Sequence, residues 1–377
     1  MDIYEEALNA HKRLKGKIEV VSKVKLTNAK DLSVYYSPGV GAVASYLAEN
    51  PEKVGDYTSV NNSVAIISDG TSVLGLGNIG PQGALPVMEG KAILFKEFAG
   101  IDAFPIVLNT QDPDEIIETI YNIAPSFGGI NLEDFAAPNC FYIESELKKR
   151  LSIPLMHDDQ HGTAIVVLAG LINAMKVTNR KLSEAKIVVA GAGAAGTAIV
   201  KILNKYANPR IFVADSKGVI SPNRKDLNDE KKKLLEFSNQ SGIDGSLEDI
   251  LQGADIFIGV SRAGLLTQEM VKSMDKDPII FALANPEPEI LPELAIEAGA
   301  SIVATGRSDY PNQVNNVLAF PGLFKGALET KSLITSKRKM EAAEAIANII
   351  VNPTREHIIP SVFDKKVVEA VSSVFNK

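Results

Sequence analysis

The sequence predicts an α/β fold in two parts, a larger part built on a doubly wound parallel sheet and a smaller α/β part ahead of it. Two observations support this prediction. Short apolar runs rich in β-branched residues alternate with helical stretches along the chain, which is typical of a largely parallel sheet. In the second half, the first of these runs leads into a glycine-rich turn and then a helix, as at the start of a doubly wound domain.

The N-terminal part contains both kinds of segment. Residues 64–68 form an apolar run that ends at Asp69 and Gly70, as expected of a buried strand followed by a turn. Residues 114–123 carry isoleucines at helical spacing, so an amphipathic helix is expected there. We expect this domain to cover residues 1–156.

The second part begins with residues 162–176, which are small and apolar enough to form a buried helix. Runs with strand character follow at residues 186–190, 210–214, 255–259, 278–282 and 301–305. With helical crossovers between them, these runs predict a Rossmann-like domain over residues 157–325. Residues 326–377 are rich in Ala, Glu and Lys. We expect them to form helices that complete the N-terminal domain, which would then be discontinuous in sequence.

The glycine-rich turn has the spacing of a dinucleotide-binding loop. It reads Gly191-Ala192-Gly193-Ala194-Ala195-Gly196 and lies between a strand and a helical run. The first glycine permits the tight turn, the second lets the backbone approach a pyrophosphate, and the third allows close packing of helix on strand. The helix N-terminus, at Ala194 and Ala195, would supply free amides for the phosphates. The spacing alone could be a structural turn, but its context favours a cofactor site.

Asp215 ends the next strand, near the separation of roughly 20 residues at which a ribose-binding acid is expected. Its carboxylate suits the free 2′-hydroxyl of NAD and would repel the 2′-phosphate of NADP. Lys217, close by, could partly offset that repulsion. NAD is therefore the expected cofactor, with NADP as the alternative.

Two pairs of acids in the N-terminal half indicate a metal site: Glu133-Asp134 and Asp158-Asp159. Carboxylates from separate segments can converge on one Mg²⁺ or Mn²⁺ ion, because both ions prefer oxygen ligands. Alternatively, the second pair could cap the helix that follows it. His157 and His161 flank that pair, but a site dominated by carboxylates is a poor zinc site. We therefore expect exposed or hydrogen-bonding histidines.

Two further residues could transfer protons. Lys91 leads into an apolar helix, where loss of hydration would favour its neutral, proton-accepting form. Tyr36 stands beside the rigid turn at Pro38 and Gly39 and could donate a proton. Without further context, a structural role explains each of them more often.

The composition argues against several classes of protein. A net charge of −7 does not indicate a nucleic-acid surface, and the basic run at residues 231–233 is flanked by acids, as on a solvated helix face. Cys140 is the only cysteine, so a disulfide framework within the chain is impossible and a packing role is expected. No signal peptide and no membrane span are expected, which makes the cytoplasm the default location.

Taken in order, the motifs resemble those of the malic enzyme family, in its short bacterial and archaeal form. The resemblance covers nearly the whole chain. It includes Tyr36-Ser37-Pro38-Gly39-Val40, Asp69-Gly70, Leu74-Gly75-Leu76-Gly77-Asn78-Ile79-Gly80, Glu89-Gly90-Lys91, Asn131-Leu132-Glu133-Asp134-Phe135, His157-Asp158-Asp159-Gln160-His161-Gly162-Thr163, the Gly191 to Gly196 turn, Ala284-Asn285-Pro286 and residues 315–322.

The resemblance implies a role for each candidate residue. Tyr36 would be the proton donor and Lys91 the general base. The implied ligands of Mn²⁺ or Mg²⁺ are Glu133, Asp134 and Asp159. Asp158 is similar to an acid that supports the base or the cofactor. The implied ligands of the substrate carboxylates are Asn285 and Asn316, with Asn285 also near the nicotinamide.

The reaction implied by the resemblance is the oxidation of L-malate by NAD or NADP with release of carbon dioxide and pyruvate, and the decarboxylation of oxaloacetate as a further activity. The family also suggests a homodimer. Larger eukaryotic members carry an arginine that clamps malate, where this chain has Thr71-Ser72-Val73, so another cation, Lys96 or Arg307, would have to help neutralise the carboxylate. The remaining alternatives are an amino-acid dehydrogenase, which would need no metal acids, and a catalytically silent dinucleotide sensor.

Overall fold

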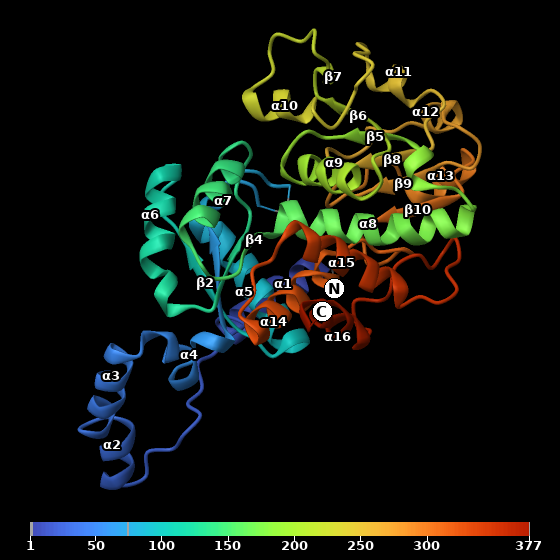
Figure 1. The fold of residues 1–377 in the computed structure, drawn as a ribbon. Coiled ribbons are helices and arrows are strands. Elements are labelled where there is room, and N and C mark those ends of the chain that lie inside the picture. Colours follow the sequence, from blue (N-terminus) through green and yellow to red (C-terminus); the bar gives the residue numbers. More distant parts are fainter. Residues whose placement is uncertain (1–2, 74, 377) are drawn as a thin grey trace.

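The computed structural model describes residues 3–73 and 75–376, so Leu74 of the Leu-Gly-Leu-Gly stretch lies outside the described residues. Two separate sheets form the body of the chain (Figure 1). All strand pairs in both sheets are parallel except one pair at an edge, which confirms the α/β class predicted from the sequence.

The N-terminal sheet has four strands in the order β2-β1-β3-β4. Its elements are β1 (Ser63–Ser68), α5 (Gly80–Ala99), β2 (Asp102–Val107), α6 (Pro113–Ile123), β3 (Gly129–Leu132), α7 (Asn139–Arg150) and β4 (Leu155–His157). Every residue of β1, β3 and β4 is buried, as expected of parallel strands covered on both faces. Asp69, Glu133 and Asp158 each follow directly on one of these strands, so they share the carboxyl edge of the sheet.

The second sheet has six strands in the order β10-β9-β8-β5-β6-β7. Its elements are β5 (Lys186–Ala190), α9 (Ala194–Ala207), β6 (Arg210–Asp215), β7 (Gly218–Val219), α10 (Asp229–Leu234), α11 (Leu247–Leu251), β8 (Ile256–Gly259), α12 (Gln268–Ser273), β9 (Ile279–Ala282), α13 (Pro292–Glu297) and β10 (Ile302–Thr305). The parallel strands are the predicted ones, and β7 is an additional antiparallel edge strand. The strand order reverses between β5 and β8, where doubly wound sheets bind their ligands.

Helix α8 (Asp158–Thr178) begins beside β4 and runs between α9 of the second part and the C-terminal helix α15 (Figure 1). It is the one helix among residues 3–73 and 75–376 that is long and apolar enough to cross a membrane, but 67% of its apolar window is buried inside the protein, as in the core helix of a soluble protein.

The C-terminal helices are α14 (Phe320–Thr330), α15 (Ser336–Asn348) and α16 (Lys366–Ser372). The ring of Phe95, on α5, lies 4.7 Å from the ring centre of Phe320 and 5.4 Å from that of Phe324. Helix α14 therefore packs on the N-terminal part, and the helical segment begins at Phe320 instead of residue 326. The discontinuous N-terminal domain remains a proposal that this packing supports.

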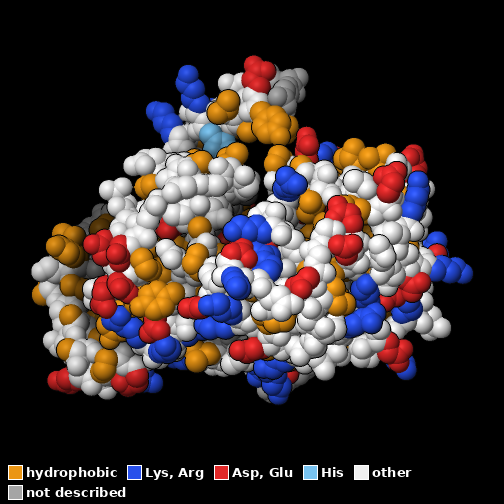
Figure 2. Space-filling view, turned by 90° about the horizontal axis from the view of Figure 1, so that it is seen from above, with side chains coloured by type: hydrophobic (Ala, Val, Ile, Leu, Met, Phe, Trp, Pro, Cys, Tyr) orange, Lys and Arg blue, Asp and Glu red, His pale blue; other side chains and the backbone are white. Residues whose placement is uncertain are grey.

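Helices α2 (Ala29–Tyr35), α3 (Gly39–Glu49) and α4 (Val54–Tyr57) project from the body (Figure 1), and we call residues 29–57 the arm. These helices contain no buried residue, and neither does α1 (Ile3–Leu14). Large apolar side chains exposed on the arm are Leu32, Val34, Tyr35, Tyr36, Val40, Val43, Tyr46 and Tyr57. By contrast, the face drawn in Figure 2 carries acidic and basic side chains interspersed.

Candidate active site

Three acids gather at the carboxyl edge of the N-terminal sheet. Glu133 and Asp134 follow β3, and Asp159 is the second residue of α8, directly after the neighbouring strand β4. One carboxylate oxygen of each acid lies within 4.8 Å of the others, close enough for a single cation to bind all three. The pairing of β3 with β4 thus brings the two segments together.

These acids fit a divalent ion. Asp134 is buried, and its Oδ2 atom has no hydrogen-bond partner among the described residues. Burial, and after it the neighbouring carboxylates, raise the pKa of Asp134 to about 9, and burial raises the pKa of Glu133 to about 8. Asp134 also has a φ of 58°, in the left-handed region that non-glycine residues rarely adopt. A buried carboxylate oxygen without a partner, next to two further carboxylates, suits Mg²⁺ or Mn²⁺.

Lys91 lies beside the acids, on the buried face of α5. Its Nζ atom donates to Glu133 Oε1 at 2.8 Å and to Asp158 Oδ2, and it lies 4.1 Å from the ring centre of Phe320. Burial lowers the pKa of Lys91, but the two carboxylates together raise it by more, so the pKa lies above its ordinary value. The expectation that burial alone makes Lys91 neutral is therefore wrong for this arrangement.

Asn316 connects the second half of the chain to the start of α8. It opens the short helix η5 (Asn316–Leu318), and its side-chain amide donates to Asp158 Oδ2. A Cβ atom at Gly162 would lie 2.1 Å from Asp158 Oδ1 and 2.9 Å from the Cβ atom of Asn316, so the close approach requires glycine. The capping alternative is wrong, because the N-cap of α8 is His157 and no side chain caps it.

Glu144, on α7, supports the same helix start, and the sequence analysis missed it. Its carboxylate accepts a 3.1 Å hydrogen bond from the backbone N–H of His157 and lies 2.9 Å from Nε2 of His161 and 2.7 Å from Nζ of Lys148. Nε2 of His157 lies 3.1 Å from Asp159 Oδ2. Both histidines therefore contact carboxylates within the protein.

The glycine-rich turn has the geometry that its spacing predicts. Gly191 has a φ of 124°, and a Cβ atom at Gly196 would lie 1.9 Å from the carbonyl oxygen of Gly191. A Cβ atom at Gly193 would meet nothing within 4 Å, so this backbone is open to an approaching phosphate. Helix α9 begins at Ala194, which puts the amides of Ala194 and Ala195 in its first turn.

Asp215 ends β6 as predicted, but its carboxylate is already occupied. Arg224 donates to both oxygens, at 2.7 and 3.2 Å, Lys231 donates at 2.6 Å, and the backbone N–H of Lys217 donates at 2.9 Å. Burial raises the pKa of Asp215, but these donors lower it by more. The sequence pattern had indicated a solvated helix face for Lys231. The contact with Asp215 shows that this face is not purely solvated.

Asn285 lies where the two halves of the chain approach each other. A Cβ atom at Gly75, in the stretch that follows β1, would lie 2.6 Å from the carbonyl oxygen of Asn285. A Cβ atom at Gly306, after β10, would lie 3.1 Å from its amide nitrogen. Arg307 follows Gly306 directly, and this position near Asn285 makes Arg307 the better placed of the two candidate cations. Its guanidinium group pairs with Asp309 at 2.6 Å.

Tyr36 and Lys96 are not brought to the acids within one chain. Tyr36 directly follows α2 on the arm and is 66% exposed, and Figure 1 shows α2 well apart from α5. Lys96 lies on an exposed surface, where it pairs with Asp102 at 2.7 Å.

Two family models match this chain. Residues 15–148 match the malic enzyme N-terminal domain, and residues 160–374 match the malic enzyme NAD-binding domain. The second match includes the C-terminal helices that pack beside α5 and α8.

Similar proteins carry the same family name. The bifunctional malic/malolactic enzyme of Bacillus subtilis is 57% identical, over 100% of this chain and 93% of its own length. The NADP-dependent malic enzyme of Escherichia coli is 45% identical, over 99% of this chain and 52% of its own length. The crystal structure of the NAD-dependent malic enzyme of Thermotoga maritima has a TM-score of 0.96 at 52% identity and covers 98% of both chains. This chain therefore belongs to the malic enzyme family.

Proposed function

We propose that this chain oxidises L-malate with NAD or NADP and releases pyruvate and carbon dioxide, with the help of Mn²⁺ or Mg²⁺. The observation that carries the proposal is the buried contact between Lys91 and Glu133, because it joins a candidate base to a candidate metal ligand. The glycine-rich turn supplies the neighbouring dinucleotide site.

Glu133, Asp134 and Asp159 would hold the divalent ion, which supplies Lewis-acid stabilisation of negative charge on a substrate oxygen. Asp134 Oδ2, which has no other partner among the described residues, is available as a ligand. If the Glu133 carboxylate binds the divalent ion, its attraction for the proton of Lys91 would weaken. Lys91 would then release that proton to solvent and, as the neutral amine, accept the proton of the C2 hydroxyl while hydride leaves C2 for the nicotinamide.

Asn316 and Asn285 would bind the carboxylates of malate. Asp158 orients both Lys91 and Asn316, so base and substrate would be positioned by one carboxylate. Arg307, in the loop beside Asn285, would help to neutralise the second carboxylate. Substrate held between these residues would bring the two halves of the chain together and exclude water.

A second copy of the chain would supply Tyr36, which would protonate C3 of the pyruvate enolate left by the loss of carbon dioxide. Two facts support this. Tyr36 is exposed on the arm, away from Lys91 of its own chain, and the arm carries many exposed apolar side chains without a covering element. In a two-fold dimer each arm would reach the partner's site, so both sites would be completed together.

Both dinucleotides would serve as cofactor. Hydrogen bonds already occupy both oxygens of Asp215, so this acid discriminates less between NAD and NADP than the sequence suggests. Arg224 and Lys231 could turn toward a 2′-phosphate. A cytoplasmic location is proposed because the single cysteine, Cys140, is buried and free, as in proteins of reducing compartments.

Initial rates with malate and each dinucleotide, with and without Mn²⁺ or Mg²⁺, test the proposal. We expect reduced dinucleotide and pyruvate in equal amounts, and only when the metal is present. Lactate should be measured as well, because the Bacillus subtilis relative is named a malic/malolactic enzyme. Turnover that survives a strong chelator, or oxidation of an amino acid in place of malate, would contradict it.

A further inference from the structure

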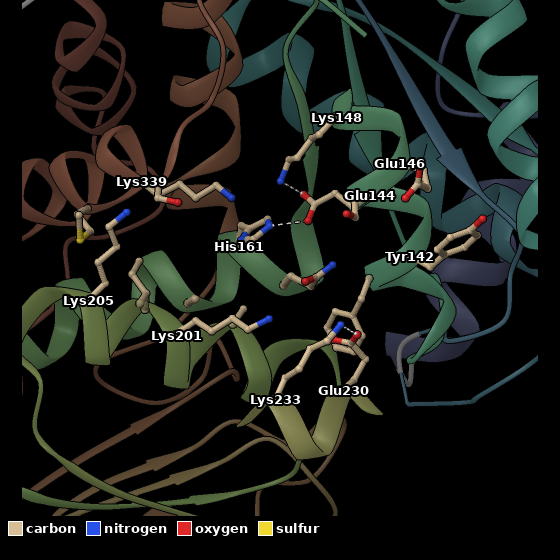
Figure 3. A pocket seen from close by; sticks show the side chains of 18 of the residues that line it. Tyr142, Glu144, Glu146, Lys148, His161, Lys201, Lys205, Glu230, Lys233 and Lys339 are labelled. Atoms are coloured by element: carbon tan, nitrogen blue, oxygen red, sulfur yellow. Dashed lines mark hydrogen bonds and ion pairs between the residues drawn. The ribbon is translucent and has the colours of Figure 1, made fainter. Parts of the chain in front are cut away.

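A cavity outside the candidate active site is lined by α7, α8, α9, α10 and α15 and is rich in lysine (Figure 3). Its volume of about 650 Å³ lies in the range of small-molecule sites. The lysines that line it are Lys148, Lys149, Lys201, Lys205, Lys233 and Lys339. We call this space the lysine cavity.

The lysine cavity holds more positive than negative charge. Three of its lysines pair with the three glutamates that line it: Lys148 with Glu144, Lys149 with Glu146, and Lys233 with Glu230. Lys201, Lys205 and Lys339 have no ion pair with any carboxylate in the described part of the chain. In Figure 3 the amino groups of Lys148 and Lys339 point toward His161, and that of Lys201 points across the cavity toward Lys233.

Lys339 has no directly contacting counter-charge in the described part of the chain, although the charge of Glu144 acts on it from further away. It is 6% exposed on α15, and within residues 3–73 and 75–376 its amino group makes no hydrogen bond or ion pair. Burial, and after it the charge of Lys148, hold the pKa of Lys339 well below its usual range. An anion bound in the cavity would supply the missing partner.

We propose that the lysine cavity binds a small organic phosphate that regulates the enzyme. Phosphate carries up to two negative charges on oxygens that face in several directions, which suits several lysine point charges. No arginine lines the cavity among the described residues, so the positive charge of its wall comes from lysine ammonium groups alone, which bind phosphate as point charges. Phe141, Ile202 and Met340 line other parts of the wall and would contact the organic portion of the ligand.

Glu144 links the lysine cavity to the metal ligands. On the cavity side it contacts Lys148 and His161, and on the other side it accepts from the backbone of His157, whose ring lies 3.1 Å from Asp159. An anion that draws Lys148 away from Glu144 would therefore alter the support of Asp159. This coupling rests on the proposed function, whereas binding of the anion does not.

Calorimetric titration of inorganic pyrophosphate into the metal-free full chain, with NAD saturating to block the dinucleotide site, tests the binding. We expect one saturable site per chain, weakened about tenfold by Lys339→Met and by Lys201→Met, the effect typical of losing a charged hydrogen bond. Lys181→Met, which removes an exposed lysine paired with Glu184 outside the cavity, is the matched control and should bind as the wild type does.

No saturable binding, or equal weakening in all three variants, would overturn the site. Lys201 is exposed, so its variant remains informative if Lys339→Met fails to fold. Succinate, titrated in the same way, represents a dicarboxylate. If it binds as tightly as pyrophosphate, the assignment to a phosphate is wrong.

Initial rates of malate oxidation with Mg²⁺ and saturating NAD, with inorganic phosphate against chloride at equal ionic strength, test the coupling. We expect phosphate to change the KM for malate in the wild type and in Lys181→Met but not in Lys339→Met or Lys201→Met. Binding without any kinetic effect would overturn the regulatory role and leave the proposed function intact. No malate turnover under any condition would instead contradict the proposed function.

Discussion

The Nζ atom of Lys91 donates a 2.8 Å hydrogen bond to Oε1 of Glu133, in the buried interior of the N-terminal half. A side chain proposed to accept the substrate proton is thus held by one proposed to bind the metal. Because Asp158 contacts Lys91 as well, the lysine keeps its proton in the metal-free protein. Proton transfer and metal binding are therefore expected to be coupled.

Replacing Lys91 by alanine should lower kcat for malate oxidation by about 10²- to 10⁴-fold, the range typical of a lost general base. The reason is that no other lysine contacts Glu133 and Asp158 in the described part of the chain. Lys96→Ala is a matched control, because Lys96 lies on the same helix but pairs with Asp102 at an exposed surface. Undiminished turnover in Lys91→Ala would end the assignment of Lys91 as the base.

The raised pKa values of Glu133 and Asp134 predict that the metal-free protein loses stability as pH rises. In the unfolded chain these carboxyls titrate near pH 4, whereas in the folded protein their pKa values are raised to about 8 and about 9. Between these limits the folded state binds more protons, so the free energy of unfolding falls with pH, by at most about 1.4 kcal/mol per pH unit for each group.

Thermal unfolding in a chelator, from about pH 5 to about pH 8, measures this effect. Asp134→Asn should flatten the profile because it removes one carboxyl whose pKa is raised to about 9. A wild-type stability that rises over this range, with the same profile in Asp134→Asn, would contradict the raised pKa values.

Mn²⁺ should stabilise the wild type by about 2.7 kcal/mol at a concentration of 100 times its Kd, because it binds only the folded acids. Asp134→Asn and Asp159→Asn should each lose most of this gain, measured as the shift in Tm. Glu184→Gln, on an exposed surface, should keep it. Equal stabilisation of all these proteins would mean that Mn²⁺ binds elsewhere.

Mixed oligomers test whether Tyr36 acts on the partner's site. Tyr36→Phe and Lys91→Ala should each be nearly inactive alone. In a mixture with random exchange of chains, about a quarter of the wild-type activity should return, since a mixed dimer has one intact site. If tagged mixed dimers form without recovery of activity, Tyr36 does not act across the dimer.

Replacing Arg224 by alanine should shift cofactor preference toward NAD, by about tenfold in the ratio of kcat/KM values, because it frees Asp215 for a ribose and removes a cation from the 2′-phosphate. The kcat/KM values for both dinucleotides measure this shift. Lys232→Ala, which removes an exposed lysine paired with Asp229, serves as the control. An unchanged ratio in Arg224→Ala would remove Asp215 from cofactor selection.

The elements that the sequence predicted correctly are those with a local pattern. The parallel strands are apolar runs, the turn at Gly191 has its own spacing, and Cys140 is buried as expected. Strand β7 has two residues, too few for any periodicity. Contacts between distant segments also leave no local signal.

Three side chains illustrate that limit. Lys231, on α10, reaches Asp215 at the end of β6, although its own segment is typical of a solvated face. Glu144 is a buried glutamate in a polar helical segment and becomes important only when α7 packs beside the start of α8. Tyr36 belongs to a motif that the sequence shows, but the sequence could not indicate that this motif lies on an exposed arm.

Anomalous scattering from Mn²⁺ in crystals of the full chain tests most directly whether one divalent ion binds next to Lys91. We predict a single strong peak at about 2 Å from carboxylate oxygens of Glu133, Asp134 and Asp159. Crystals that turn over malate with Mn²⁺ but contain no such peak between these three acids would contradict the account.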